Sequence, residues 1–232
     1  MKKGRTPMIK GILFDMDGVL LDTEGMGRHL FVTICAELGY DFKPEDFIHY
    51  LGCTYDEDER MMKERYGDDF PFAYMYGEYR RRLQEYIVSD TDVYKPYVSE
   101  CFTELKKRGL KMALATSTAR PIFESYLPHL PRMQNAFDAT VCGVEAGRGK
   151  PFPDIFLEAA RRLGLKPEEC IGVEDSYKGL QSLTAAGCVR VLIPDIMPYG
   201  ERVHGLVDYT LENLSQLPGL VDRLNLNAKQ RS

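Results

Sequence analysis

The stretch "FDMDGVLLD", residues 14–22, places two carboxylates two positions apart directly after a short apolar run. That run, "IKGILF" at residues 9–14, predicts a buried strand that ends at Asp15. Asp17 follows, and Gly18 allows the chain to turn tightly behind it. Two acids so close together repel each other and raise each other's pKa, so this strand end requires a compensating positive charge.

From residue 97 onward, strand patterns and helix patterns alternate. Helix patterns occupy residues 97–108, begin near Pro121, follow Pro153, and run from Ser176 to Gly187. Because single helices separate the strands, we expect right-handed crossovers and a parallel sheet, which is an α/β fold. The predicted strands are "LKMALAT" (110–116), "ATVCG" (139–143), "CIGVED" (170–175) and "VRVLI" (189–193).

Residues 24–90 contain no convincing strand, and their pattern is helical. Apolar residues recur every four positions at Met26, Leu30, Ile34 and Leu38, and Gly39 predicts the end of that helix. Two further amphipathic segments follow, "DEDERMMKERYG" and "FAYMYGEYRRRLQEYI". Since this block separates the first strand from the others, we interpret residues 22–95 as an inserted helical domain, with hinges near 21–24 and 92–96. The core domain then comprises residues 1–21 and 96–232.

Polar residues capable of chemistry follow several of the predicted strands. In a parallel sheet the carboxyl ends of the strands face one crevice, so these residues should converge there. They are Asp15 and Asp17 after the first strand, Thr116 and Ser117 after the second, Lys150 after the third, and Glu174 and Asp175 after the fourth.

Clustered carboxylates of this kind suit a hard divalent cation, and oxygen-only ligands favour Mg²⁺. Asp15 and Asp175 are the candidate ligands, with Glu174 as a further one. The cation and Lys150 would also attract a phosphate dianion. The Thr116 hydroxyl and backbone N–H groups near Ser117 could hold its oxygens. One carboxylate could then attack phosphorus while another transfers protons.

Each piece also has a structural explanation. A pair of acids is common in loops, a lone lysine is usually solvated, and "ED" before Ser176 could cap a helix. Thr116 and Ser117 could form a routine turn between strand and helix. The occurrence of all the pieces in this order, each at a strand end, favours the functional interpretation.

These segments resemble a known family. "DMDGVLLD", "ATST", "GKPFPDIF" and "GVEDS" are similar to the four motifs of the haloacid dehalogenase superfamily, in its branch of β-phosphoglucomutase-like phosphatases. The resemblance covers nearly the whole core and puts the helical insertion in the usual cap position. It implies a Rossmann-like, three-layer α/β/α core with an inserted helical cap domain at residues 22–95.

The resemblance also implies roles for the site residues. Asp15 would be the nucleophile that forms an aspartyl-phosphate, and Asp17 would protonate the leaving group and then activate water. Thr116 and Lys150 would bind the phosphoryl group. The Mg²⁺ ligands would be Asp15, the Asp17 backbone carbonyl, Asp175 and, directly or through water, Glu174. The implied function is hydrolysis of a small phosphorylated metabolite, with a sugar phosphate as the leading candidate.

The main alternative is β-phosphoglucomutase, a sugar-phosphate isomerase. Mutases of this branch carry a cap histidine five residues after the hinge aspartate, where this chain has Gly27, and His29 is out of register. They also carry an arginine three residues after a cap glycine, and counting from Gly52 reaches Tyr55. Both departures favour hydrolysis. Arg28, His29, Tyr55 and Arg60 are candidates for substrate contacts, although solvated helix charges are the favoured explanation.

Other classes fit less well. A phosphorylation-sensing receiver would carry its acceptor aspartate on a central strand and lacks such an insertion. A binding protein without catalysis would be expected to lack one of the motif acids. A dehalogenase needs no second acid at the position of Asp17.

The composition narrows the partners. A formal net charge of −5 without a long basic cluster argues against nucleic acid. The six cysteines lack CxxC spacing, so we interpret them as core residues in a reducing compartment. No apolar stretch could span a bilayer, and the run after the basic N-terminus is too short for a signal peptide. We expect a cytoplasmic monomer or weak dimer without membrane partners, and a frayed polar tail at "NAKQRS".

Overall fold

The structure is a computed structural model that describes residues 7–51, 53, 55–89, 92–196, 200 and 203–230 of the 232-residue chain. Its sheet has the strand order β3-β2-β1-β4-β5-β6, and all neighbouring strands pair in parallel. The predicted parallel α/β fold is therefore confirmed. The strands are β1 (Gly11–Phe14), β2 (Lys111–Thr116), β3 (Ala139–Cys142), β4 (Cys170–Glu174), β5 (Val189–Leu192) and β6 (Tyr209–Thr210).

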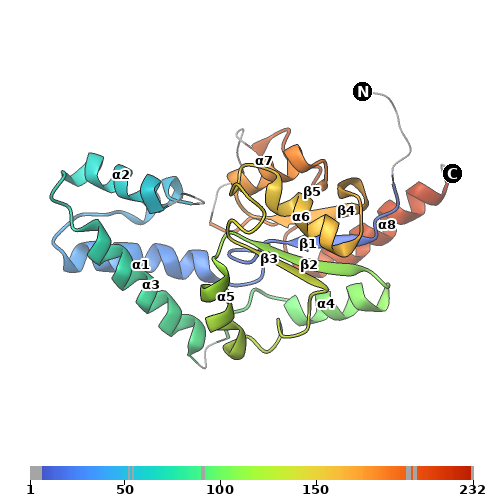
Figure 1. The fold of residues 1–232 in the computed structure, drawn as a ribbon, viewed down its shortest axis with the longest axis horizontal. Coiled ribbons are helices and arrows are strands. Elements are labelled where there is room, and N and C mark those ends of the chain that lie inside the picture. The colour runs from blue at the N-terminus through green and yellow to red at the C-terminus, as the bar shows by residue number, and fades with distance from the viewer. Residues whose placement is uncertain are drawn as a thin grey trace.

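Helices cover both faces of the sheet (Figure 1), because successive side chains of its buried strands point to opposite faces. Ile12 and Phe14 of β1 pack with α4 (Val98–Lys107) and α8 (Leu217–Gln230). Leu13, between them, packs with α6 (Asp154–Leu163) and α7 (Tyr177–Ala186) on the other face. Burial on both sides explains why β1 reads as a continuous apolar run. The three-layer α/β/α core is confirmed.

The inserted block is helical, as predicted. It comprises α1 (Thr23–Glu37), η1 (Pro44–His49), α2 (Tyr55–Tyr66) and α3 (Phe72–Val88), which lie beside the sheet and not on its faces (Figure 1). Phe31 lies at the centre of this block, with ring centroids 4.8 Å from Tyr79 and 5.1 Å from Phe47. Aromatic packing of this kind stabilises the small helical block.

Two connections join the inserted helices to the core, and they lie side by side. Leu21 and Tyr94 form an antiparallel bridge. Backbone hydrogen bonds flank it, from Asp22 N to Val93 O (2.8 Å) and from Lys95 N to Leu20 O (2.9 Å). The two segments predicted as hinges are therefore a paired two-stranded connection. A fifth helix of the core, α5 (Arg120–Tyr126), follows β2 and begins next to Pro121 as expected.

The prediction of a frayed C-terminal tail is wrong for residues 227–230. These residues belong to α8, Ala228 is buried, and Asn225 of the same helix bonds both backbone groups of Ile9, at 2.7 and 3.0 Å. The polar residues of this segment occupy the exposed face of an amphipathic helix. Residues 231–232 lie outside the described residues.

Two further expectations can be compared with the structure. All six cysteines are free thiols. Five of them are buried, which confirms their interpretation as core residues, whereas Cys53 is only half-buried. Among the described residues, none of the helices is long and apolar enough to cross a membrane.

Candidate active site

The structure brings the acids of two neighbouring strands together. Asp15 follows β1 directly, Glu174 ends β4, and Asp175 is the next residue. The parallel register pairs Phe14 with Val173, so the strands end side by side. All three carboxylates are buried, and one oxygen from each lies within 4.8 Å of the others.

Lys150 provides the compensating positive charge. It lies in the loop between β3 and α6, and its Nζ donates to Oδ1 of Asp15 and to Oε1 of Glu174, both at 2.5 Å. Burial lowers the pKa of Lys150, but the two carboxylates outweigh this effect and hold the pKa above its ordinary value. The lysine is therefore a buried, permanently charged group between two acids.

The remaining acid repulsion fits a bound cation. Burial raises the pKa of Asp15 to about 8 despite the attraction of Lys150, and Glu174 and Asp17 add to the increase. Burial and repulsion by Glu174 also hold the pKa of Asp175 well above its usual range. The single positive charge of Lys150 cannot neutralise three carboxylates. Their oxygens are the ligands that Mg²⁺ prefers.

Two glycines leave room for this cluster. Gly18 has a φ of +76°, and a Cβ there would collide with the Asp175 carboxylate. A Cβ at Gly179, in the first turn of α7, would collide with the Glu174 carboxylate. Because glycine has no side chain, the backbone at these two positions can lie directly against the carboxylates, and this close contact keeps both carboxylates in place.

Asp17 has a different environment from Asp15. Its Oδ1 accepts a hydrogen bond from the Thr23 hydroxyl (2.7 Å), and its Oδ2 accepts one from the Thr118 hydroxyl (3.2 Å). Thr23 begins α1 and Thr118 follows β2, so the two bonds fix this carboxylate between the inserted helices and the core. A carboxylate held in one orientation beside a second acid can serve as a proton donor and acceptor.

The threonine and serine after β2 occupy different positions. Thr116 is fully buried, its hydroxyl accepts from the Thr118 N–H at 3.0 Å, and it is absent from the cavity wall. Ser117 and Thr118 line the cavity instead. Thr118, which the sequence interpretation did not single out, therefore presents a hydroxyl where Thr116 was expected to.

A cavity of about 940 Å³ lies between the inserted helices and the core. From the core it is lined by Asp15, Asp17, Lys150 and Asp175. The inserted block contributes mainly aromatic and charged side chains, which include Glu24, Tyr50, Asp58, Tyr76, Tyr79 and Arg80. The volume is sufficient for a small phosphorylated molecule.

The structure does not bring the predicted substrate-contact candidates of the insertion to this cavity. Arg28 and His29 are exposed on α1, and Arg60 pairs with Glu64 on the surface of α2 at 2.6 Å. Tyr55 is also absent from the wall. Solvated helix charges, the favoured explanation from the sequence, therefore account for Arg28, His29 and Arg60. Gly52 lies outside the described residues.

Glu24 is a further acid at the site that the sequence interpretation missed. It lines the cavity, and burial raises its pKa to about 8, with repulsion from Asp17 and Asp195 adding to the increase. The signal for it was its position two residues after the "FDMDGVLLD" stretch, at the entry to α1. Without the helix orientation, that signal could not be distinguished from an acid in the first turn of a helix.

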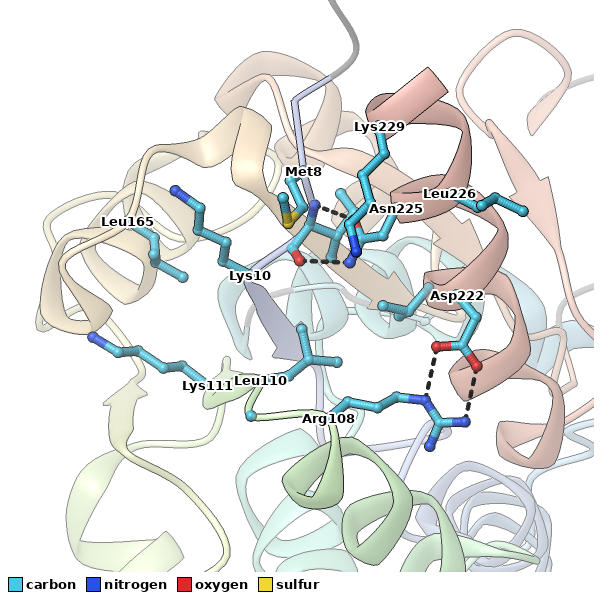
Figure 2. A pocket seen from close by; sticks show the side chains of 13 residues that line it. Met8, Lys10, Arg108, Leu110, Lys111, Leu165, Asp222, Asn225, Leu226 and Lys229 are labelled. Atoms are coloured by element: carbon cyan, nitrogen blue, oxygen red, sulfur yellow. Dashed lines mark hydrogen bonds and ion pairs between the residues drawn. The ribbon is translucent and has the colours of Figure 1, made fainter. Parts of the chain in front are cut away.

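A second hollow, of about 610 Å³, lies at the amino-terminal ends of β1 and β2, opposite the cluster of acids. Figure 2 shows its lining of basic and apolar side chains between the start of the strands and α8. Two of its four basic side chains are paired with acids: Arg108 binds Asp222 through two hydrogen bonds, and Lys10 pairs with Glu169. Because it lacks the acids of the strand ends, it is the weaker candidate for an active site.

The family can now be stated. The sequence matches the haloacid dehalogenase-like hydrolases over residues 12–193, which is most of the chain. The chain belongs to this family, and the prediction from its four motifs is confirmed.

Several relatives are similar over nearly their whole length. Protein CbbY from Cereibacter sphaeroides is 30% identical over 223 residues, which cover 92% of this chain and 96% of that protein. Hexitol phosphatase B from Escherichia coli is 26% identical over 217 residues, with coverages of 90% and 94%. By contrast, the chain spans only 18% of a 33% identical Arabidopsis thaliana relative, Protein SUPPRESSOR OF QUENCHING 1, chloroplastic.

A solved structure extends the similarity to the fold. The crystal structure of CbbY from Rhodobacter sphaeroides in complex with phosphate matches this chain with a TM-score of 0.74 at 27% identity. The match covers 90% of this chain and 96% of that one. The inserted helices are therefore part of a shared architecture.

Proposed function

We propose that this chain is a Mg²⁺-dependent phosphatase that hydrolyses a small phosphorylated metabolite, with a sugar phosphate as the leading candidate. The observation that carries the proposal is the meeting of Asp15, Asp17 and Lys150 at one cavity, with Asp15 in a buried ion pair and Asp17 held by two hydroxyls. The names of two relatives support it, hexitol phosphatase B and a CbbY whose crystal structure contains phosphate.

In the first step an oxygen of Asp15 attacks phosphorus and the bond from phosphorus to the ester oxygen breaks. Asp17 gives a proton to that oxygen, so the leaving group departs as an alcohol. The product on the enzyme is an aspartyl-phosphate at Asp15. The Thr23 and Thr118 bonds to Asp17 orient its carboxyl group for this transfer.

In the second step water attacks the phosphorus of the aspartyl-phosphate. Asp17, now a carboxylate, takes a proton from that water, and inorganic phosphate leaves while the Asp15 carboxylate is restored. Lys150 remains paired with Glu174, and it neutralises charge on Asp15 and on the phosphate oxygens. Ser117, which lines the cavity, would hold the remaining phosphate oxygens through its hydroxyl or backbone N–H group.

Asp15, Asp175, Glu174 and the Asp17 backbone carbonyl would hold the Mg²⁺ ion. When bound, this ion would neutralise the acids and polarise a phosphate oxygen. The buried carboxylate cluster and the two glycines beside it support this assignment.

We also propose that residues 22–95 act as a cap over a core of residues 1–21 and 96–232. The cap would exclude bulk water while Asp15 carries the phosphoryl group. Two contacts between cap and core support this assignment: Lys178 of α7 pairs with Glu57 of α2 at 2.7 Å, and Arg80 of α3 donates to the Tyr126 hydroxyl at 3.2 Å.

β-Phosphoglucomutase remains the alternative activity. Gly27, at the position expected for the mutase histidine, lies close to Tyr79 and Phe47 and offers no proton-transfer group. The aspartyl-phosphate would then transfer its phosphoryl group to water and not to a second hydroxyl of the substrate, which favours hydrolysis.

The test measures phosphate release from a panel of sugar and polyol phosphates in Mg²⁺ or in EDTA. The panel includes glucose 1-phosphate with a trace of bisphosphate, and its products are identified. We expect Mg²⁺-dependent phosphate release that Asp15→Asn abolishes. Glu168→Gln is the control and should leave the release unchanged, because Glu168 is an exposed acid at the other end of the strands. Glucose 6-phosphate without free phosphate would identify a mutase, and wild-type activity of Asp15→Asn would exclude Asp15 as the nucleophile.

A further inference from the structure

Asp58 is a buried acid that the catalytic steps do not use. It lies in the first turn of α2, is 6% exposed, and lines the cavity that Asp15 and Asp17 line from the core. No residue in the described part of the chain donates a hydrogen bond to its Oδ1. Because a buried polar atom without a partner destabilises the fold, its position points to a partner that arrives with a ligand.

Helix stability does not explain this burial. Acids near a helix N-terminus interact favourably with the helix dipole, but exposed Asp56 provides that effect without desolvation. The nearby cation Lys178 is directed elsewhere, because its Nζ pairs with Glu57 at 2.7 Å. That ion pair joins α2 to the core and holds the adjacent Asp58 at the cavity wall.

The charges around Asp58 restrict what the partner can be. Asp58 itself would repel an anionic group, and Arg80, which lines the same cavity, would oppose a cationic one. The charges of Glu57 and Lys178 largely cancel, because these two residues pair with each other. Neutral hydroxyl groups remain, and a carboxylate accepts hydrogen bonds from them in either orientation. The aromatic faces of Tyr50 and Tyr76 in the same wall suit the C–H surface of a carbon chain that carries such hydroxyls.

We infer that Asp58 accepts a hydrogen bond from a hydroxyl of the substrate's carbon chain and thereby selects phosphorylated sugars and polyols over phosphate esters without hydroxyls. This inference rests on the proposed phosphatase activity. Asp58 is a specificity residue and not a catalytic one, because it lies on α2 whereas phosphorus must lie beside Asp15.

The experiment compares Asp58→Ala with wild type on three kinds of phosphate ester. These are polyol and sugar phosphates, such as sorbitol 6-phosphate and glucose 6-phosphate, then p-nitrophenyl phosphate, and then O-phosphoethanolamine. At pH 8, where the Asp58 carboxyl group is ionised, loss of a hydrogen bond to it should lower kcat/KM for the best hydroxylated ester roughly 10- to 100-fold, mainly through KM. The rate with p-nitrophenyl phosphate should stay unchanged. Asp58→Asn, whose amide oxygen still accepts, should recover part of the loss.

Asp56→Ala is the matched control, because it removes the same charge from the same helical turn at an exposed position. An equal loss on all esters, or an equal loss in Asp56→Ala, would overturn the assignment of Asp58. A loss confined to O-phosphoethanolamine would overturn it too, because the partner would then be a cation. A wild-type protein that releases phosphate from none of the esters would instead overturn the proposed function, and this inference with it.

Discussion

Nζ of Lys150 lies 2.5 Å from Oδ1 of Asp15, although 135 positions in the sequence separate the two residues. The parallel sheet makes this possible, because the residues that follow β1 and the loop that follows β3 both lie at the carboxyl ends of the strands. The same nitrogen also contacts Glu174 at 2.5 Å, so one buried cation serves two acids. Much of the site's electrostatic balance depends on this side chain.

Replacement of Lys150 by Met should therefore destabilise the protein as well as inactivate it. Removal of one partner from a buried ion pair leaves an uncompensated charge and typically costs about 3–5 kcal/mol. Urea unfolding measures the loss. Lys107→Met is the control, because Lys107 forms only a surface pair with Glu104, and such pairs contribute at most about 1 kcal/mol. Equal stability of the two variants would show that Lys150 is not needed to neutralise the buried acids.

Asp175→Asn should separate metal binding from folding. Without Mg²⁺, the loss of one of three crowded carboxylates relieves repulsion, so this variant should be at least as stable as wild type in EDTA. Mg²⁺ should raise the melting temperature of wild type, because an ion that binds only the folded state stabilises it. Asp175→Asn should lose most of that increase. An unchanged response to Mg²⁺ would place the ion elsewhere.

The core could be predicted from the sequence because its strands are buried on both faces. Such strands read as short apolar runs, and each stops where a polar residue is needed, as at Asp15 and at Glu174. Topology then brings these ends together without any knowledge of side-chain packing. The strand-end acids and Lys150 were predictable for this reason.

The cavity wall of the insertion was not predictable in the same way. A helix pattern shows which positions are apolar, but not whether a polar position faces solvent or a cavity. Arg28 and His29 were candidates for substrate contacts and are exposed, whereas Glu24 and Asp58 were not singled out and line the cavity. Two threonines, Thr116 and Thr118, lie at the turn after β2. The geometry of this turn decides which of them lines the cavity, and the structure shows that Thr118 does.

Thr118→Val should lower kcat by roughly 10-fold and leave KM nearly unchanged, because it removes one hydrogen bond to Asp17 and leaves the phosphate ligands in place. Thr118→Ser keeps the hydroxyl and should recover most of the rate. Steady-state kinetics on the best substrate measure both effects. Thr103→Val removes a threonine hydroxyl from the exposed surface of α4 and should change neither parameter. Wild-type kcat in Thr118→Val would show that the bond to Asp17 does not contribute, because valine keeps the methyl group of threonine and lacks only the hydroxyl.

Asp58→Asn should stabilise the folded protein at neutral pH, by an amount that disappears towards about pH 4. Burial, followed by repulsion from Glu57, raises the pKa of Asp58 from 3.8 to about 7, against the attraction of Lys178. Between pH 3.8 and about pH 7, Asp58 therefore keeps its proton in the folded wild type but has lost it in the unfolded chain. Wild-type stability therefore falls as the pH rises through this window and is constant above it.

Asn carries no such proton, so the stability difference between Asp58→Asn and wild type should grow from about pH 4 to about pH 7 and then level off. Its upper limit is about 4 kcal/mol, the value that corresponds to the full change in pKa. Urea unfolding across this range measures it, with Asp56→Asn as the exposed control that should show no such growth. A difference that stays constant with pH would mean that Asp58 ionises alike in the folded and unfolded chain. The carboxyl group would then be better solvated than its position in the cavity wall indicates.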